Sequence, residues 1–263
     1  MRDFLEDAEG AVERGEVGPG KANRGRDIPT LPKRFYSSVD VDEDDAGFAV
    51  LLDNKPVKTP GRNPLVVSTK KGAELVAAEW AAVQSEINPL LMPVTRIVNT
   101  AIDGVATEMQ AVIEDIIRYA ASDLLCYRAD APEGLVDLQR QHWDRVLDWI
   151  ENEHAARFDL AEGVMHIEQP REAIQAFGNR LRQHADPIKM ACLHTFTSLS
   201  GSALLSLALA EEFLNAEQAW KAAHVDEAWN VKQWGEDHEA LERRLQRWTD
   251  FEAADRLIKA VAS

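Results

Sequence analysis

Residues 34–69 read RFYSSVDVDEDDAGFAVLLDNKPVKTPGRNPLVVST, and this stretch decides the fold class. Its apolar and β-branched runs have the length of strands, and the spacers DEDDAG, Asp53-Asn54 and GRNP are rich in turn-forming residues. The sequence therefore predicts a small antiparallel sheet over about residues 34–68, with a tight hairpin at Asp53 and Asn54.

After Thr69 the hydrophobic period changes from two residues toward 3.6, which is typical of amphipathic helices. Asn215 and Gln218 form a pattern that predicts a helix start at residue 216, and a long terminal helix is expected from about Leu241. Strands that come first, followed by helices, favour an α+β fold. We expect a small antiparallel β-rich N-terminal lobe packed on a larger, mostly α-helical C-terminal lobe.

The pattern divides the chain into three parts. Residues 1–32 mix acidic residues, Gly, Pro and Arg without periodicity, so a mobile acidic arm is expected there. The β-rich lobe with its following helix is placed at 33–85, and the α-helical lobe at 86–263. An uncharged stretch over 190–210 is interrupted by Ser and Thr, and it indicates two short buried helices that meet near Ser200 and Gly201 rather than a membrane span.

Composition narrows the functional class. The 263 residues carry a formal net charge of -16, which argues against nucleic acid as a partner and favours basic protein partners. The only two cysteines, Cys126 and Cys192, lie in apolar contexts and are interpreted as buried, reduced thiols. The first residues, MRDFLEDAEGAVERGEVGPG, resemble neither a secretory signal nor a transit peptide, so a bacterial cytoplasmic location is expected.

The sequence contains only weak signals for catalytic, nucleotide-binding or metal-binding motifs. There is no glycine-rich phosphate loop, and TSLSGS lacks the glycine of a nucleophile elbow. The seven histidines show no metal-ligand spacing, although His224 or His238 with neighbouring acids could supply nitrogen and oxygen ligands. We therefore expect no catalytic activity, no cofactor and no metal, and keep a small metal-dependent hydrolase as an alternative.

The segment VDEAWNVKQWGEDHE, residues 225–239, combines two tryptophans with a cluster of acids. Trp229 and Trp234 are five residues apart and so lie on adjoining faces of a helix, and Gly235 allows the chain to turn. Large aromatic side chains beside negative charge suit a protein-recognition surface. The alternative is that both rings belong to the core and the acids are merely solvated.

Five blocks resemble, in order and spacing, the assembly chaperone of the F-type ATP synthase that acts on the alpha subunit. The resemblance covers about residues 35–244. The blocks are LLDNKPVKTPGRNPLVV, MPVTRIVNTAIDG, YAASDLLCYRA, QRQHWDRVLDWIE and VDEAWNVKQWGEDHEA. In the second block, Arg96 is expected to pair with an acid such as Asp103 or Asp123 and so to brace the fold.

The resemblance implies a binding protein that holds the unassembled alpha subunit and prevents its aggregation until the beta subunit replaces it. We expect it to be monomeric when free, with no membrane insertion. The resemblance also implies a critical acidic position in the C-terminal region, for which Glu227 and Glu236 are preferred because of their longer reach. A general holdase with no single client is a further alternative. The predicted partner-binding residues are Asp226, Glu227, Trp229, Trp234, Gly235, Glu236 and Asp237.

Overall fold

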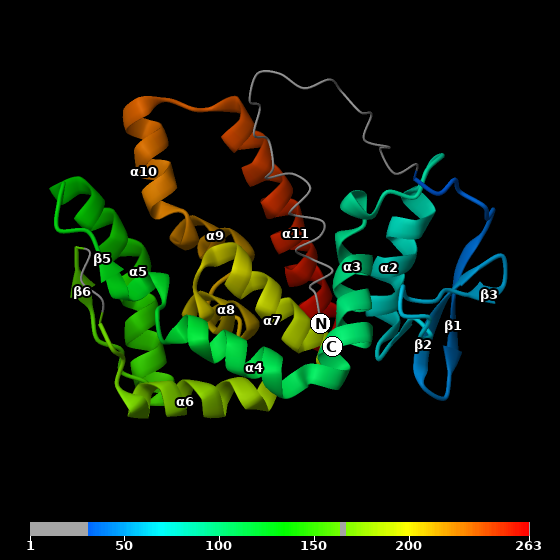
Figure 1. The fold of residues 1–263 in the computed structure, drawn as a ribbon, viewed down its shortest axis with the longest axis horizontal. Helices are drawn as coiled ribbons and strands as arrows, with labels where there is room; N and C mark the ends of the chain where they lie inside the picture. The colour runs from blue at the N-terminus through cyan, green and yellow to red at the C-terminus, as the bar shows by residue number, and fades with distance from the viewer. Residues whose placement is uncertain (1–30, 164–166, 263) are drawn as a thin grey trace, which may run out of the picture. The chain divides into compact units, whose positions relative to one another are not determined.

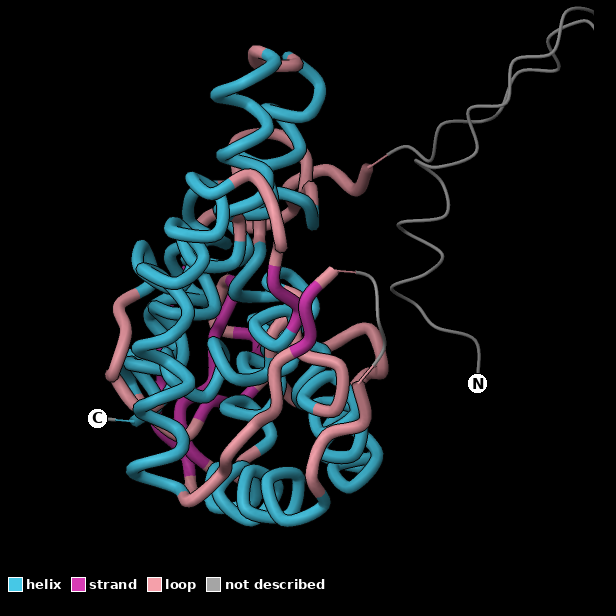
Figure 2. Tube along the Cα trace, turned by 90° about the vertical axis from the view of Figure 1, so that its left-hand side faces the viewer, coloured by secondary structure: helices cyan, strands magenta, loops and turns pink. Residues whose placement is uncertain are grey.

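A computed structural model describes residues 31–163 and 167–262 (Figure 1). The predicted mobile arm lies almost entirely outside the described residues. Residues from Pro32 onward form one compact unit. The division of this unit into a β-rich lobe (33–85) and an α-helical lobe (86–263) stays a prediction. The α+β class is confirmed, because a small antiparallel sheet precedes a part of the chain that is mostly helical (Figure 2).

The sheet is built on strand β2. Its order is β1-β2-β3, all neighbours are antiparallel, and β4 also pairs with β2. Asp53 and Asn54 have φ values of 47° and 62°, as the two central residues of a type I′ turn require, so the predicted hairpin is confirmed. The strands are β1 (Val39–Asp44), β2 (Gly47–Leu52), β3 (Lys55–Pro56) and β4 (Val66–Val67).

Strand β1 ends later than the sequence predicted. It runs through Asp44, three residues into the DEDDAG spacer, because all six of its residues pair with β2. As the edge strand of the sheet, β1 exposes Asp40, Asp42 and Glu43, so its acidic side chains stay hydrated while the backbone continues the ladder.

The helices begin and end where local chemistry allows. Thr69 accepts a hydrogen bond from the amide of Gly72 and so starts α2, as the change of period predicts. The capping box of Asn215 and Gln218 is confirmed at the start of α9. The α-helices are α2 (Lys70–Ala82), α3 (Pro93–Thr100), α4 (Ala106–Ala120), α5 (Glu133–His154), α6 (Arg171–Leu181), α7 (Pro187–Ser200), α8 (Ala203–Ala210), α9 (Ala216–Ala223), α10 (Val225–Trp234) and α11 (His238–Ala262).

Short elements connect these helices. A π-helical turn, η2 (Ala101–Val105), joins α3 to α4, and two short strands, β5 (Tyr127–Arg128) and β6 (Ala161–Glu162), pair in parallel. The 3-10 turns are η1 (Pro89–Leu91), η3 (Leu124–Cys126) and η4 (Arg182–His184).

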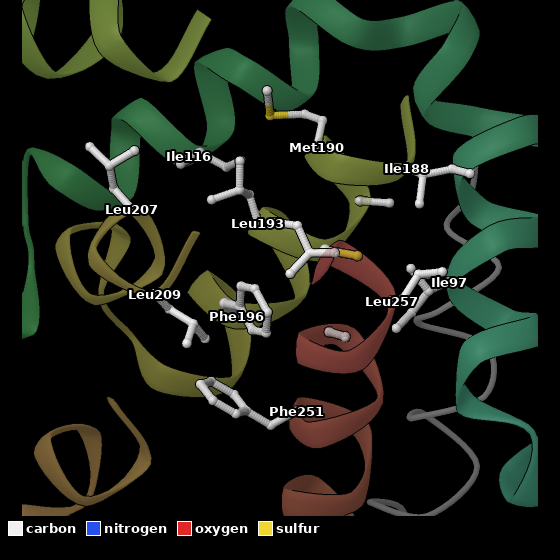
Figure 3. Close-up of a cluster of buried hydrophobic side chains, with 14 of the residues drawn as sticks. Ile97, Ile116, Ile188, Met190, Leu193, Phe196, Leu207, Leu209, Phe251 and Leu257 are labelled. Atoms are coloured by element: carbon white, nitrogen blue, oxygen red, sulfur yellow. The ribbon is translucent and has the colours of Figure 1, made fainter. Parts of the chain in front are cut away.

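The core centres on α7, α8 and the second half of α11 (Figure 3). The uncharged stretch 190–210 forms the predicted pair of buried helices, and Gly201 separates them with a φ of 70°. Among the described residues, no helix combines the length and the apolarity that crossing a membrane requires. Figure 3 shows part of this cluster of buried side chains, among them Ile97, Ile116, Met190, Leu193, Phe196, Leu207, Phe251 and Leu257.

Two blocks from the resemblance meet in space at Asp103, in the π-helical turn. Its carboxylate accepts hydrogen bonds from the Thr59 hydroxyl (2.6 Å), the Gly61 amide (2.7 Å) and the Asn63 side chain (2.8 Å). Burial acts to raise the pKa of Asp103, but these three donors outweigh it and lower the pKa. Asp103 therefore fastens the loop after β3 to the helical part of the chain.

The predicted partners of Arg96 are wrong. Arg96 pairs instead with Asp250 on α11 (2.6 Å), so it links α3 to the long terminal helix. The Asp103 carboxylate instead accepts the hydrogen bonds from the loop after β3. Asp123 is fully buried, accepts from the amides of Leu125 and Leu204, and has its pKa raised by burial to about 6.

Candidate partner-binding surface

The candidate partner-binding surface, with an exposed tryptophan beside acidic residues, lies where α10 passes into α11, at the top of Figure 1. Helix α10 ends at Trp234 because Gly235 adopts a φ of 90°, a region that side chains disfavour. The Asp237 side chain then accepts a hydrogen bond from the amide of Ala240 (3.0 Å) and starts α11. All residues from 230 to 240 are exposed. We call this segment the α10–α11 corner.

Two of the predicted site residues, Asp226 and Trp229, are partly buried and hold α10 against α5. Asp226 accepts a hydrogen bond from the Gln139 side chain on α5 (2.8 Å), and Gln139 in turn accepts from the Ala129 amide (2.8 Å). Trp229 is half-buried against α5, where a Cβ placed on Gly134 would lie only 2.8 Å from its ring. Both contacts fix α10 to the body of the molecule.

The remaining predicted residues are open to water. Trp234 is 87% exposed, the largest value among the exposed large hydrophobic side chains that the structure describes. Glu227, Glu236 and Asp237 are also exposed. The alternative that both tryptophans belong to the core is therefore wrong for Trp234, and it holds only in part for Trp229.

The charge around this surface is strongly negative. Residues 226–242 carry six carboxylates and one lysine, a formal charge of −5 with histidine neutral. Arg243 and Arg244 follow directly, and Arg243 pairs with Glu239 (3.7 Å). Four of the acids, those at the corner and in the first turns of α11, are exposed. These four are Glu236, Asp237, Glu239 and Glu242. Such a field attracts and orients a basic surface.

The histidines singled out in the sequence have other surroundings. His224 is buried beneath Trp220, whose carbonyl lies 2.9 Å from the His224 Nδ1 atom, and burial lowers the pKa of His224. His238 is exposed and lies 3.4 Å from Glu242. Within residues 31–163 and 167–262, no group of three or more His, Cys, Asp or Glu side chains is arranged to hold a metal ion.

Both cysteines are free and buried, as predicted for reduced thiols. Burial raises the pKa of Cys126 and of Cys192, so neither forms the thiolate that nucleophilic chemistry needs.

Two groups of residues were not predicted from the sequence. Gln139 supports α10, yet only its place in the block QRQHW marked it. Leu90 and Leu91 are exposed by 60% and 74%, and the only signal was a pair of leucines directly after Asn88-Pro89, a sequence typical of turns.

Comparisons with known proteins identify the family of the chain. A family model described as "ATP12 chaperone protein" matches residues 33–151. The crystal structure of a candidate chaperone from Agrobacterium tumefaciens is 54% identical, has a TM-score of 0.85, and the match covers 88% of this chain and 87% of that one.

Two further relatives carry the name Atp12. The crystal structure of Atp12 from Paracoccus denitrificans is 35% identical with a TM-score of 0.80, and the match covers 88% of this chain and 98% of that one. The mitochondrial Atp12 protein of Schizosaccharomyces pombe is 22% identical over 222 residues, which cover 80% of this chain and 76% of the relative. The fold, the matched residues and the identity to solved relatives together place this chain in the ATP12 chaperone family, a family of binding proteins and not of enzymes.

Proposed function

We propose that this protein is an assembly chaperone of the F1 ATP synthase that binds the unassembled alpha subunit. It prevents that subunit from aggregating until the beta subunit takes its place. Membership of the ATP12 family and the resemblance of five sequence blocks to the alpha-subunit chaperone support this assignment. The single observation that carries the binding role is the exposed ring of Trp234 at the α10–α11 corner.

The exposed Trp234 side chain has no stabilising role within the folded chain, because most of its apolar area stays in water. A partner that covers the ring removes this area from water and gains the binding energy typical of aromatic hot spots. The corner is also held in place, since Asp226 and Trp229 fix α10 to α5. The ring is therefore presented on a preorganised support, which lowers the entropic cost of binding.

The acids around Trp234 supply orientation. Glu227 and Glu236 are exposed. Glu227 lies 4.0 Å from the buried His224, a weak surface contact, so reversal of the two acids acts mainly on the local field. We assign them the role of orienting a basic patch on the alpha subunit, with Asp237 and Gly235 shaping the turn between the helices. Binding of this kind needs neither nucleotide nor metal.

Release follows from competition. A chaperone that occupies an interface of the free subunit lowers the concentration of the aggregating species by mass action. The beta subunit, which fits the same interface better, then displaces the chaperone. We place the reaction in the bacterial cytoplasm and expect the free chaperone to be monomeric, because its charge of -16 opposes self-association.

A pair of charge reversals tests the surface. In the variant Glu227→Lys/Glu236→Lys we expect affinity for isolated alpha subunit to fall about tenfold or more, since attraction becomes repulsion. The matched control is Glu153→Lys/Glu162→Lys, which makes the same change of charge at exposed positions on α5 and β6. Pull-down of alpha subunit measures capture, and circular dichroism checks the fold. Undiminished capture by the first variant rejects this surface.

A second experiment with the wild-type protein distinguishes an alpha-subunit chaperone from a general holdase. Affinity purification from a cell extract should retain alpha subunit as the main partner, whereas many unrelated partners at similar abundance would favour the general holdase.

A further inference from the structure

Helix α5 holds the start of α10 through two side chains that lie one turn apart. The Trp143 Nε1 atom donates a hydrogen bond to the Ala222 carbonyl (2.7 Å), in the last turn of α9. The Gln139 side chain, four residues earlier on α5, donates to the Asp226 carboxylate (2.8 Å), in the first turn of α10. The two partners lie in the opposite order along the chain, so α5 runs antiparallel to the α9–α10 segment. The two bonds set the register between them.

The Gln139 side chain uses both ends of its amide. Its Oε1 atom accepts a hydrogen bond from the Ala129 amide (2.8 Å), while its Nε2 atom donates to Asp226. The Ala129 end is fixed, because the preceding Arg128 pairs with Asp144 on α5 (2.8 Å). Gln139 is only 3% exposed, so it does not reach a partner itself. A shift of α10 would leave a buried polar group without its hydrogen bond, and the bridge therefore resists such a shift.

The second half of α10 projects beyond α5. A Cβ placed on Gly134, the second residue of α5, would lie 2.8 Å from the Trp229 ring, so Trp229 packs at the very start of α5. Trp234 lies five residues further along α10, which is about 7.5 Å at the rise of an α-helix. Figure 1 shows α10 continuing past the start of α5 toward the corner. The ring on which the proposed function depends therefore lies on a helix end whose direction is set at the base of the helix.

This arrangement lets a contact at the base of α10 control the position of Trp234. Asp226 and Trp234 are eight residues apart, or about 12 Å along the helix axis. A tilt of α10 at Asp226 consequently moves the ring further than it moves the base. Binding sites need their anchoring side chains held to within about 0.5 Å by the residues that support them.

We propose that Gln139 is the positioning residue of the α10–α11 corner. Its amide bridge between Ala129 and Asp226 sets the direction of α10, and capture of the client depends on this bridge although Gln139 does not touch the client. The identity of the client, the alpha subunit, rests on the proposed function, whereas the positioning of α10 does not.

The test breaks the bridge with an isosteric change and then repairs it. In Gln139→Glu the introduced carboxylate still accepts from Ala129, but it faces the Asp226 carboxylate, so a hydrogen bond becomes a repulsion. The second change, Asp226→Asn, supplies a donor again and restores the net charge of the wild type, because donor and acceptor have exchanged places. The matched control is Gln110→Glu, which makes the same change at an exposed glutamine that donates to Glu114 on α4 (2.8 Å).

Hydrogen exchange of the α10 amides measures the positioning without a client, and titration of isolated alpha subunit measures capture. Gln139→Glu should raise the exchange of α10 and weaken capture about tenfold, and Gln139→Glu/Asp226→Asn should return both to within about threefold of the wild type. The Gln110→Glu control should match the wild type in both. If Gln139→Glu alone does not fold, recovery of folding and capture in the double variant supports the bridge.

Unchanged exchange or unchanged capture in Gln139→Glu overturns the inference. A double variant in which either quantity stays at the level of the single variant overturns it as well, and recovery of exchange alone would mean that Asp226 contacts the client directly. A wild type that captures no alpha subunit rejects the proposed function instead, and the exchange of α10 still decides whether Gln139 positions the helix.

Discussion

Replacing Trp234 with alanine separates the stability of the chain from its capture of a client. Because the side chain is 87% exposed, its removal should change the free energy of unfolding by less than about 0.5 kcal/mol. A covered tryptophan buries up to about 250 Å², and at about 25 cal/mol/Å² the exposed part corresponds to at most about 5 kcal/mol. Truncation at an aromatic hot spot removes part of this, so we expect a loss of about 2–4 kcal/mol in binding, or about 30- to 1000-fold.

The assay is titration of isolated alpha subunit into wild type, Trp234→Ala and Trp234→Phe, with urea unfolding of each chaperone alone. The phenylalanine variant should retain part of the affinity, because a smaller ring still covers apolar area. The contrast is Trp229→Ala, which removes a half-buried ring packed near Gly134 and should lower the stability of the chaperone itself. If Trp234→Ala binds within twofold of wild type, the corner is not the contact surface.

Two further predictions concern the fold. Asp103→Ala removes three hydrogen bonds, including that from Thr59, and should lower the free energy of unfolding by about 2–3 kcal/mol; a change below about 0.5 kcal/mol in urea unfolding would contradict the fastening role. Burial acts to raise the pKa of Glu211, but His184 and Arg180 outweigh it and lower that pKa to about 2, so the stability that Glu211 adds above pH 4.5 is lost as pH falls through 2. Glu211→Gln should therefore flatten acid unfolding over this range by up to about 3 kcal/mol, and an unchanged profile would refute the assignment.

Local chemistry made much of the fold predictable. The hairpin at Asp53 and Asn54, the start of α2 after Thr69 and the capping box at Asn215 each depend on residues within a few positions of one another. Their conformations follow from turn and cap preferences that do not need the rest of the chain.

Long-range partners were not predictable in the same way. Arg96 pairs with Asp250, which is 154 residues away, because α3 and α11 cross in the folded chain. A helical pattern says which face of α3 is polar but not which helix covers that face. The extension of β1 through Asp44 was missed for a related reason, since acidic residues suit an edge strand as well as a turn.

The sequence predicted that the candidate site lies on a helix that ends at a glycine. It did not predict which of the site residues are exposed and which pack against α5. The segment 225–234 is helical and stops before Gly235, as the pattern indicates. Which tryptophan faces water depends on Gly134 and Gln139, which lie on α5 about 90 residues earlier. The amphipathic pattern of α10 does not show which residues of other helices pack against it. The exposure of Trp234 could therefore be seen only in the structure.

The most direct measurement mixes the purified chaperone with isolated alpha subunit, without ATP, and follows aggregation by light scattering. We expect that an equimolar amount of wild type suppresses aggregation and that added beta subunit restores free chaperone. Aggregation that proceeds unchanged with a severalfold excess of folded chaperone would show that this chain does not occupy the interface of the unassembled alpha subunit.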